Sequence, residues 1–385
     1  MSYKVVIPTA GTGSRLDRLT KYLNKSLVSL AYRPVLSHLI DQFPKDCVFV
    51  IVLGYKGHLV RDFLKIAYPK RTFQFTTVDP YIGPNSGLGR SLLCSEKFLQ
   101  EPFVFISCDT LVKESIPAPK VNWMGYHKVK NVKSYRTLQI KNQRVYKIFE
   151  KGANTKDQEA YIGFAGIKDY NIFWDAMHKG DDTPILQGEV CGMRGVIEKE
   201  SVSAHFFTWY DTGNLDSLNS AQKAYSIGNE PIILHKEKEA IWFVGKQVIK
   251  FSDDEVFIKN RVKRALLLKD YVPKVIESSK NMYAYNKVKG RILSDAITLP
   301  IMNKLLDHCK NFWRLCSLNE DQRKTFNQIC LKFYKDKTYD RLNSFYKKYN
   351  QLDSDNIING EHVPSLHDMF IEMDWDNLAN GIPCR

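Results

Sequence analysis

Residues 5–19, VVIPTAGTGSRLDRL, begin as an apolar run, break into small residues and then turn basic. The three β-branched residues at 5–7 predict a buried strand. The loop at 9–14 has glycines and short side chains, so its backbone N–H groups can approach a ligand closely. A loop of this kind after a strand usually holds phosphate, and a tight structural turn is the alternative.

Two familiar phosphate-binding motifs do not fit this loop. A dinucleotide fingerprint needs glycine at the sixth position of G-x-G-x-x-G, but the run that begins at Gly11 has Leu16 there. The spacing of a P-loop, G-x-x-x-x-G-K-[ST], is absent from the sequence. Arg15 follows directly after the small residues, which suggests instead an anionic group that is moved or released.

The composition is that of an ordinary globular protein: of 385 residues, 44% are hydrophobic and 25% are charged. This length allows two or more domains with real cores. The longest β-like run, 48–53, is far too short to span a membrane, and the sequence opens on a strand rather than a signal peptide. The eight cysteines form no C-x-x-C pair, which favours reduced thiols. We therefore expect a cytoplasmic protein without a membrane span.

The formal net charge of +14 raises the question of a nucleic-acid partner. The sequence contains no recognisable nucleic-acid-binding module, and its lysines are spread along the whole chain. The densest basic cluster, at 259–264, lies in a helical stretch and is typical of a solvated or phosphate-facing helix side. An anionic small-molecule substrate explains the charge as well, so we expect no nucleic-acid partner.

The first half of the chain alternates strand-like and helix-like segments. The strands are expected at 5–7, 47–53, 73–78 and 103–108, and the helices between them at 34–42, 57–67 and 87–99. This order predicts an α/β fold with a Rossmann-like, mostly parallel sheet that helices cover on both faces. Ligands on such sheets bind at the carboxyl ends of the strands, where the glycine loop and Asp109 both lie.

The segments after this alternation predict a change of structure. Short strands between 121 and 167 indicate an inserted antiparallel element, and 169–226 indicate helices around one strand at 202–209. A polar stretch with a turn signal follows at 228–240. We place a domain boundary there, giving domains 1–230 and 231–385.

Residues 5–42 resemble the signature region of the sugar-phosphate nucleotidyltransferase family, which has a glycine loop, an arginine, and a lysine in an apolar segment ahead of a helix. Further similar segments follow in order: LGYKGHLVRDFL, GLGRSLLCSEKFL, FVFISCDTLV, FEKG, YIGFAGI and WYDTGNLDSL. They cover most of 3–226. The resemblance implies an enzyme in which a phosphate monoester attacks the α-phosphorus of a nucleoside triphosphate and releases pyrophosphate.

The resemblance also implies roles for individual residues. Arg15 would neutralise the pyrophosphate leaving group, and Lys25 would bridge the α-phosphate and the attacking phosphate; an ordinary surface lysine is the alternative for Lys25. Nucleotide binding is implied for two glycine-containing segments, comprising Ala10, Gly11, Thr12, Gly13, Ser14, Gly87, Leu88 and Gly89. Acceptor binding is implied for Glu150, Lys151 and Gly163.

Two aspartates each follow a predicted strand, Asp109 after FVFIS and Asp211 after HFFTW. An acidic residue in such a place is either a helix cap or a metal ligand, and both readings are open on the sequence alone. The resemblance implies that the two carboxylates hold one Mg²⁺ that bridges the nucleotide phosphates. The chain departs from the family pattern at Thr9-Ala10 and at Asn24, where a proline usually precedes the lysine.

Residues 241–290 predict a hairpin that turns at Gly245, a helix and two further strands. They resemble the ATP-binding lobe of the aminoglycoside phosphotransferase and choline kinase family, with Lys250 in place of the lysine that holds ATP phosphates and 288–290 in place of the hinge. A lysine on an ordinary strand is the alternative. Asn260 and Arg261 stand where the family has a glutamate.

The catalytic loop of that kinase family, H-x-D followed by asparagine, is absent from the sequence. MDWDN at 373–377 resembles its later metal-binding motif, but the apolar spacing at 366–373 favours a helix. We therefore expect a kinase-like N-lobe of α+β type with trailing helices. It is either part of a longer protein or a degenerate module, and it is inactive as a kinase in this chain.

Together, the two resemblances imply a Mg²⁺-dependent nucleotidyltransferase that couples a nucleoside triphosphate to a small phosphorylated alcohol or sugar. CTP with a phosphorylated alcohol is slightly favoured, because choline-type kinases make such monoesters; a sugar 1-phosphate is the alternative. The product would be a precursor for surface or capsular polysaccharide. A non-catalytic nucleotide-binding scaffold is the rival from another class, and a homo-oligomer is left open.

Overall fold

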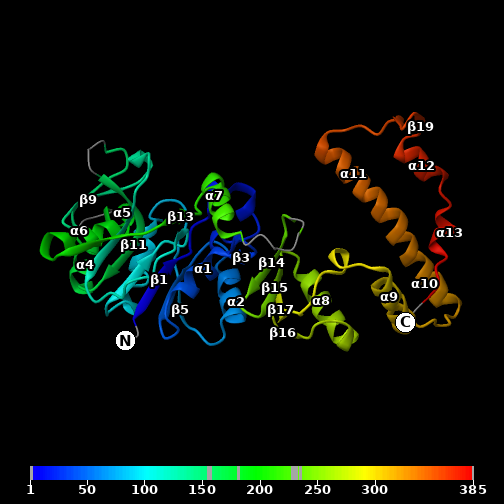
Figure 1. Cartoon of the computed structure of the whole chain (residues 1–385), viewed down its shortest axis with the longest axis horizontal. Coiled ribbons are helices and arrows are strands. Elements are labelled where there is room, and N and C mark those ends of the chain that lie inside the picture. Colours follow the sequence, from blue (N-terminus) through cyan, green and yellow to red (C-terminus); the bar gives the residue numbers. More distant parts are fainter. Residues whose placement is uncertain (1–2, 154–157, 180–182, 227–232, 234–235, 384–385) are drawn as a thin grey trace. The chain divides into compact units, whose positions relative to one another are not determined.

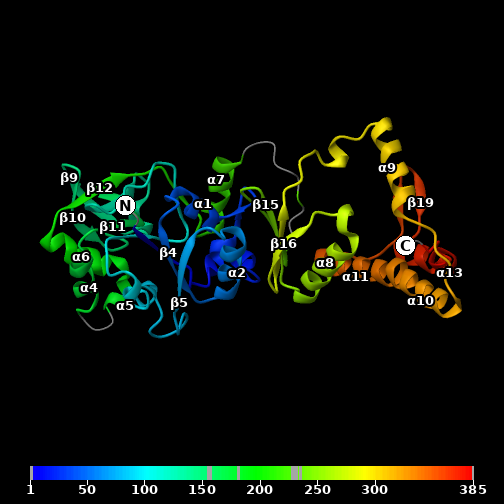
Figure 2. The same ribbon diagram turned by 90° about the horizontal axis from the view of Figure 1, so that it is seen from below.

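The computed structural model describes residues 3–153, 158–179, 183–226, 233 and 236–383. The chain divides into two compact units, residues 1–288 and 289–385 (Figures 1 and 2).

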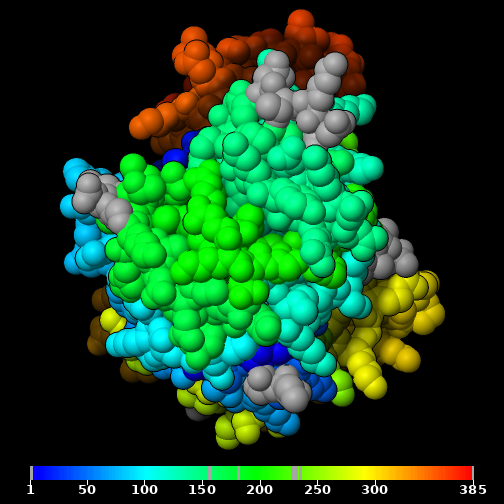
Figure 3. Space-filling model, turned by 90° about the vertical axis from the view of Figure 1, so that its left-hand side faces the viewer, coloured from blue at the N-terminus to red at the C-terminus, as the bar shows by residue number. Residues whose placement is uncertain are grey.

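The first unit is built on a nine-stranded sheet in the order β5-β4-β1-β6-β11-β8-β12-β10-β9. Its strands are β1 (Lys4–Pro8), β4 (Val48–Leu53), β5 (Thr72–Thr77), β6 (Phe103–Ile106), β8 (Asn122–His127), β9 (Thr137–Lys141), β10 (Arg144–Phe149), β11 (Gln158–Ile167) and β12 (Val202–Phe206). The residues of β8–β12, together with the helices beside them, form most of the surface seen in Figure 3.

The sheet is mixed rather than mostly parallel. Strands β5, β4, β1 and β6 are parallel neighbours, as the alternating sequence predicts, and β8 and β12 are also parallel. The expectation of a mostly parallel sheet is wrong beyond β6, where β11 runs antiparallel to both β6 and β8 and β10 runs antiparallel to β9 and β12. The antiparallel strands expected between 121 and 167 are confirmed, but they continue the main sheet. Asn142 and Gln143, both at positive φ, make the tight turn between β9 and β10, so no crossover helix is needed there.

Seven helices of the described first unit flank this sheet or its edge connections. They are α1 (Val35–Gln42), α2 (Gly57–Ala67), α3 (Leu88–Leu93), α4 (Tyr170–Met177), α5 (Thr183–Gln187), α6 (Glu189–Lys199) and α7 (Leu215–Tyr225). The helix expected at 87–99 ends at Leu93, and a short 3₁₀ turn (Glu96–Phe98) follows it. The strand expected at 202–209 is divided into β12 and β13 (Trp209–Asp211), and β13 pairs with β7 (Thr110–Val112).

Alternation along β1 gives the sheet two apolar faces. Val5 and Ile7 pack in the core that contains α1, α2 and α7, whereas Val6 packs in the core that contains α3, α4 and α6. All three side chains are fully buried. Because both faces are covered, the central strands read as continuous apolar runs, and polar groups gather only where those strands end.

A second, four-stranded antiparallel sheet completes the first unit. Its order is β14-β15-β17-β16, from β14 (Glu239–Val244), β15 (Gln247–Ser252), β16 (Val275–Ser278) and β17 (Met282–Asn286), with α8 (Glu255–Leu268) between β15 and β16. The hairpin turns at Gly245, which has φ +57°, as the sequence predicts.

This sheet packs against the first half of the chain through Trp242. Trp242 is fully buried, its indole Nε1 donates to Ser29 Oγ at 2.9 Å, and its ring lies edge-on to Phe63 at 5.3 Å. The boundary placed near residue 230 therefore separates two sheets, whereas the compact unit itself continues to residue 288.

The second unit is mainly helical. It contains α9 (Leu299–Phe312), α10 (Glu320–Leu331), α11 (Lys337–Tyr349), α12 (Leu366–Glu372) and α13 (Trp375–Ala379), with a small hairpin of β18 (Asn356–Ile358) and β19 (Glu361–Val363). The helix predicted near 366–373 is confirmed as α12. Asp374 of MDWDN caps α13, since its Oδ1 accepts from the Asn377 amide at 3.0 Å. Nowhere in the described ranges is a helix both long and apolar enough to cross a membrane.

Candidate functional site

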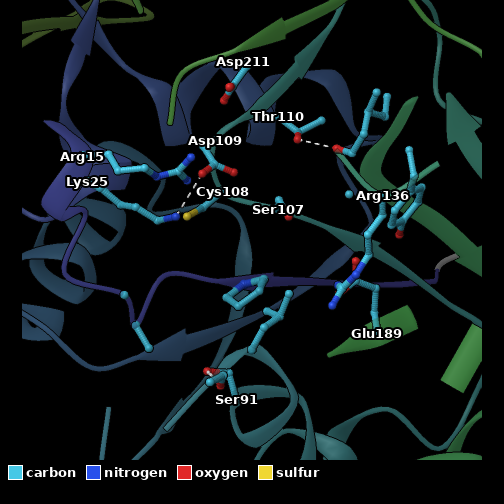
Figure 4. A pocket seen from close by; sticks show the side chains of 18 of the residues that line it. Arg15, Lys25, Ser91, Ser107, Cys108, Asp109, Thr110, Arg136, Glu189 and Asp211 are labelled. Atoms are coloured by element: carbon cyan, nitrogen blue, oxygen red, sulfur yellow. Dashed lines mark hydrogen bonds and ion pairs between the residues drawn. The ribbon is translucent and has the colours of Figure 1, made fainter. Parts of the chain in front are cut away.

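A pocket of about 460 Å³ opens at the carboxyl ends of β1 and β6 (Figure 4). Its lining includes most of the residues singled out from the sequence together with several polar residues that were not. The lining includes Ala10, Gly11, Arg15, Lys25, Gly87, Leu88, Ser107, Asp109, Arg136, Lys151, Tyr161, Gly163, Glu189 and Asp211.

Only the start of the glycine loop lines the pocket. Ala10 and Gly11 do so, whereas Thr12, Gly13 and Ser14 lie outside the lining. Gly13 has φ +68°, and a Cβ there would lie 2.8 Å from the Cβ of Lys25. Its lack of a side chain therefore lets Lys25 pack against the loop, which is a different role from binding phosphate directly.

Asn24 fixes the loop beside Lys25. Its side-chain amide donates to the Thr9 carbonyl at 2.8 Å and to the Tyr55 carbonyl at 2.6 Å, and its Oδ1 accepts from the Ser26 amide. Asn24 is fully buried. Asn24, which stands where the family usually has proline, thus forms hydrogen bonds that hold the turn containing Lys25 against the end of β1.

Lys25 and Asp109 form an ion pair inside the pocket. Lys25 Nζ lies 3.1 Å from Asp109 Oδ2 (Figure 4). Burial opposes ionisation of Asp109, but the Lys25 ammonium and the Arg15 guanidinium outweigh it and hold the pKa of the carboxyl below its ordinary value. The pKa of Lys25 is raised, since Asp109 overcomes the burial that would lower it. Both groups are therefore charged at neutral pH.

Asp211 reaches the same place from another strand. It ends β13, which pairs with β7 directly after Asp109, and the Thr212 amide donates to the Asp109 carbonyl at 2.9 Å. A Cβ on Gly213 would lie 3.0 Å from both Asp109 Oδ2 and Asp211 Oδ1, so the two carboxylates approach one point. Burial and then the negative charge of Asp109 raise the pKa of Asp211.

Asp211 does not cap the helix that follows it, because another residue fills that role. Asn214 is the N-cap of α7, and its Oδ1 accepts from the Ser217 amide at 3.0 Å. Asp211 instead accepts from the Gly213 amide at 2.8 Å and lies within 3.4 Å of the Asn214 side-chain amide. The cap of α7 thus leaves Asp211 available to the pocket.

The two aspartates fit a Mg²⁺ ion that shares its ligands with a substrate. Among the described residues, no cluster of three or more His, Cys, Asp or Glu side chains is arranged to hold a metal. Mg²⁺ commonly takes one or two carboxylates and completes its octahedron with phosphate oxygens and water. Asp109 and Asp211 offer hard oxygen atoms that converge at Gly213, which has no side chain to fill the space between them.

The second glycine segment, residues 87–89, lines part of the pocket and also allows two helices to pack closely. Gly87 and Leu88 line the pocket, but Gly89 does not. A Cβ on Gly89 would lie 1.8 Å from the Pro184 carbonyl oxygen, and one on Gly87 would lie 2.6 Å from that of Ile185. Both glycines therefore allow α3 to pack closely against α5.

Of the three residues assigned to the acceptor, Lys151 and Gly163 line the pocket and Glu150 does not. Glu150 forms ion pairs with Arg136 at 2.9 Å and with Arg194 at 2.8 Å. Arg136 does line the pocket. Glu150 thus holds a pocket residue in place, and these two ion pairs keep its pKa below its ordinary value although partial burial opposes this.

Several polar lining residues were missed by the sequence reasoning, among them Arg136, Tyr161 and Glu189. Glu189 is only 3% exposed, and burial raises its pKa to about 7. Tyr161 lies in the quoted segment YIGFAGI, but nothing in that segment indicates where its hydroxyl points. A glutamate that begins a helix is normally read as a favourable charge at the helix N-terminus, so Glu189 carried no signal of a site.

Lys250 lines a separate cavity of about 300 Å³ between α8 and the second sheet. Its wall contains two further cations and two tyrosines, namely Arg261, Arg264, Tyr283 and Tyr285. Burial, and then the like charge of Arg261, lower the pKa of Lys250. Arg261 thus faces the lysine where the kinase resemblance expects a carboxylate.

The chain is similar to two archaeal proteins named "Bifunctional protein GlmU". The one from Methanococcus maripaludis is 22% identical over 201 residues, which is 50% of this chain and 44% of that protein. The one from Methanocaldococcus jannaschii is 27% identical over 113 residues, which is 29% of this chain and 26% of that protein. The chain therefore spans less than half the length of these curated relatives. No protein-family model matches it.

Solved structures agree with the fold described above. A UDP-glucose pyrophosphorylase complexed with UDP-glucose is 19% identical, with a TM-score of 0.50 over 58% of this chain and 98% of that chain. A UDP-glucose pyrophosphorylase from Acinetobacter baumannii is 16% identical, with a TM-score of 0.51 over 60% and 95% of the two chains. At this identity the likeness shows the fold alone. The N-terminal part of the chain is thus a mixed α/β region like that of the sugar-phosphate nucleotidyltransferases.

Proposed function

We propose that the chain is a Mg²⁺-dependent nucleotidyltransferase. An oxygen of a phosphate monoester attacks the α-phosphorus of a nucleoside triphosphate, the bond from that phosphorus to the β-phosphate oxygen breaks, and pyrophosphate leaves. The observation that carries the proposal is the convergence of Lys25, Asp109 and Asp211 in one pocket that Arg15 also lines. Two anions must meet in this reaction, and two cations with two metal-competent carboxylates supply the neutralisation it needs.

The pocket residues divide this work by position. Lys25, held beside Asp109, would contact the α-phosphate and the attacking phosphate, while Arg15 would balance the charge that grows on the leaving pyrophosphate. Bound by Asp109 and Asp211, Mg²⁺ would withdraw charge from the phosphate oxygens. The backbone at Ala10 and Gly11, which lines the pocket, would position the triphosphate.

The substrates are proposed more narrowly from two sources. A solved structure of similar fold is named for UDP-glucose, which favours a sugar 1-phosphate as acceptor. The kinase resemblance favours CTP with a phosphorylated alcohol. In either case we place the product among cytoplasmic precursors of surface or capsular polysaccharide.

A pyrophosphate-release screen tests the proposal. Four nucleoside triphosphates are crossed with hexose 1-phosphates, glycerol phosphate, phosphocholine and phosphoethanolamine, with and without Mg²⁺. Release that requires both an acceptor and Mg²⁺ supports the proposal. Tight nucleotide binding without release from any pair would instead support the scaffold alternative.

A second activity is favoured by the cavity around Lys250, which we propose binds the phosphates of ATP. Lys250 of β15 and Arg261 and Arg264 of α8 line it, and burial with the charge of Arg261 outweighs the nearby Glu239 carboxylate in lowering the pKa of Lys250. Calorimetric titration with a non-hydrolysable ATP analogue tests this. Lys250→Ala should weaken binding, whereas Lys246→Ala, at the exposed hairpin turn, should not.

A further inference from the structure

The second unit leaves most of its apolar side chains uncovered. Of its described residues, 289–383, only Ser365, Ala379 and Pro383 are buried, and no described residue beyond 288 belongs to either hydrophobic core. A domain of about 100 residues normally buries roughly 60–70% of the surface that its unfolded chain exposes. Exposed apolar surface on this scale marks a place where another surface binds.

Helix α11 has a packed face and an outer face. On the packed face, the Tyr339 ring lies 5.4 Å from the ring of Phe370 on α12. Arg341, Phe345 and Lys348 follow Tyr339 by two, six and nine positions, which places them on the opposite side of the helix. All three are exposed. The outer face of α11, defined by these three residues, is therefore both apolar and basic.

The charges of this unit are divided along its sequence. Residues 289–352 contain 13 Lys and Arg and 6 Asp and Glu, whereas 353–383 contain 7 Asp and Glu and no Lys or Arg. The two stretches thus carry net charges of +7 and −7. The ion pairs that the described residues of this unit form are Lys310–Asp307 and His362–Asp355, and neither joins the basic stretch to the acidic one. The opposite charges therefore do not neutralise each other within one copy of the chain.

The acidic stretch, residues 353–383, also carries exposed apolar side chains. Met369 and Ile371 on α12 and Leu378 on α13 are exposed. Glu372 and Asp376 lie between them in the sequence and are exposed as well. The surface of the acidic stretch is thus apolar and acidic, which complements the outer face of α11 in charge and matches it in apolar character.

We propose that the second unit is a dimerisation surface, on which the outer face of α11 of one copy packs against the acidic stretch of a second copy. In a two-fold symmetric pair this contact is made twice, since each copy contributes both surfaces. The exposed apolar side chains supply the stabilisation and the opposite charges set the orientation. A different protein would need one basic and one acidic apolar surface of its own, whereas a second copy already has both. The inference does not depend on the proposed nucleotidyl transfer.

Sedimentation velocity of the full chain over a range of concentrations and at two salt concentrations tests the proposal. The wild type should be a dimer, and high salt should weaken it because exposed charges are screened. Arg341→Glu/Lys348→Glu makes the basic face acidic, and Glu372→Lys/Asp376→Lys makes the acidic stretch less acidic and more basic. Each double variant brings like charges together at both contacts and should raise the dissociation constant about tenfold or more.

Two further variants separate the contact from general effects of charge and folding. Lys65→Glu/Lys70→Glu reverses two exposed lysines of the first unit and should leave the dissociation constant unchanged. Phe345→Gln keeps every charge and removes an exposed apolar ring from the outer face of α11, so it should weaken the dimer as well. Because Phe345 is exposed and has no part in the packed face, this variant should fold even if a charge reversal does not.

Mixing the two charge-reversal variants gives the decisive result. In the mixed pair each basic surface again meets an acidic one, so an equimolar mixture should form a dimer that neither variant forms alone. Failure of the mixture to associate when both variants are folded would show that these two surfaces do not meet, and would overturn the proposal. A wild type that stays monomeric at every concentration, or a dimer that neither the reversals nor Phe345→Gln weakens, would overturn it too.

Discussion

Lys25 and Asp109 stand 84 positions apart in the chain, yet Lys25 Nζ lies 3.1 Å from Asp109 Oδ2 and each side chain is about one-fifth exposed. The pair joins the turn after the glycine loop to the end of β6. A partly buried pair of this kind is screened less than a surface one. It therefore keeps both groups charged and in place before any phosphate arrives.

Lys25→Ala and Arg15→Ala should each lower kcat for pyrophosphate release by roughly 10²–10³-fold, because both side chains act on charge that develops during transfer. Circular dichroism should show an intact fold in both variants. Arg18→Ala removes an exposed arginine outside the pocket lining and should keep wild-type turnover. Wild-type rates in either pocket variant would remove that residue from the mechanism.

Asp109→Asn and Asp211→Asn should each raise the Mg²⁺ concentration needed for half-maximal turnover, since each removes one carboxylate ligand. Asp211→Asn should change the melting temperature little, because Asn214 still caps α7. Asp216→Asn, an exposed acid in the first turn of the same helix, is the control for lost charge. A lower melting temperature with an unchanged Mg²⁺ titration would make Asp211 a structural residue.

Gly163→Ala should destabilise the protein more than Gly152→Ala. Both glycines have positive φ, +68° and +84°, and alanine there costs about 1 kcal/mol in backbone strain. At Gly163 the new Cβ would also lie 2.6 Å from Ser107 Oγ, whereas at Gly152 nothing lies within 4 Å. Urea unfolding of the two variants measures the difference, and equal losses would show that Ser107 moves aside freely.

Glu189 should make the protein less stable as the pH rises. Its pKa is raised from 4.5 to about 7 by burial, so between these values the folded protein keeps a proton that the unfolded chain has lost. The contribution of this carboxyl to stability is complete below pH 4.5 and falls by about 3 kcal/mol as the pH passes through 7.

The measurement is urea unfolding of wild type and Glu189→Gln at pH 5 and pH 8. Other titrating groups contribute equally to both proteins, so the wild type should lose more stability than the variant between the two pH values. Parallel pH dependences would mean that Glu189 is ionised in the folded protein at pH 5 as it is in water.

The chain should bind ATP without transferring its γ-phosphate. Phosphoryl transfer needs a group that positions the hydroxyl and ligands that hold metal on the phosphates. The sequence has no H-x-D motif, and Asp374 of MDWDN is engaged as a helix cap. Incubation with γ-labelled ATP and candidate alcohols, sugars and amino-alcohols should label none of them, with a choline kinase run alongside as positive control. Labelled product would make Asp374 and Asp376 catalytic candidates.

The predicted residues that carry charge on two neighbouring strands lie just after those strands end. Arg15 and Asp109 follow β1 and β6, and the end of a parallel strand is a place that local pattern identifies. The sequence could not show that Glu189 and Arg136 line the pocket, because their positions depend on contacts between distant segments, such as that of Arg136 with Gln187. The short strands at 121–167 predict antiparallel pairing, but the sequence does not show that β11 pairs with β6 in the main sheet, because an apolar strand does not indicate which strand lies beside it.

Trp242 lies on β14 of the second sheet, but its fully buried indole packs in the hydrophobic core of the first sheet. A protein cut near residue 230 would leave Phe63 and Ser29 without this neighbour. Residues 1–288 should therefore unfold in one cooperative calorimetric transition. A nucleotide bound in the Lys25 pocket should then raise the unfolding temperature of the second sheet, which carries Lys250, together with that of the first sheet.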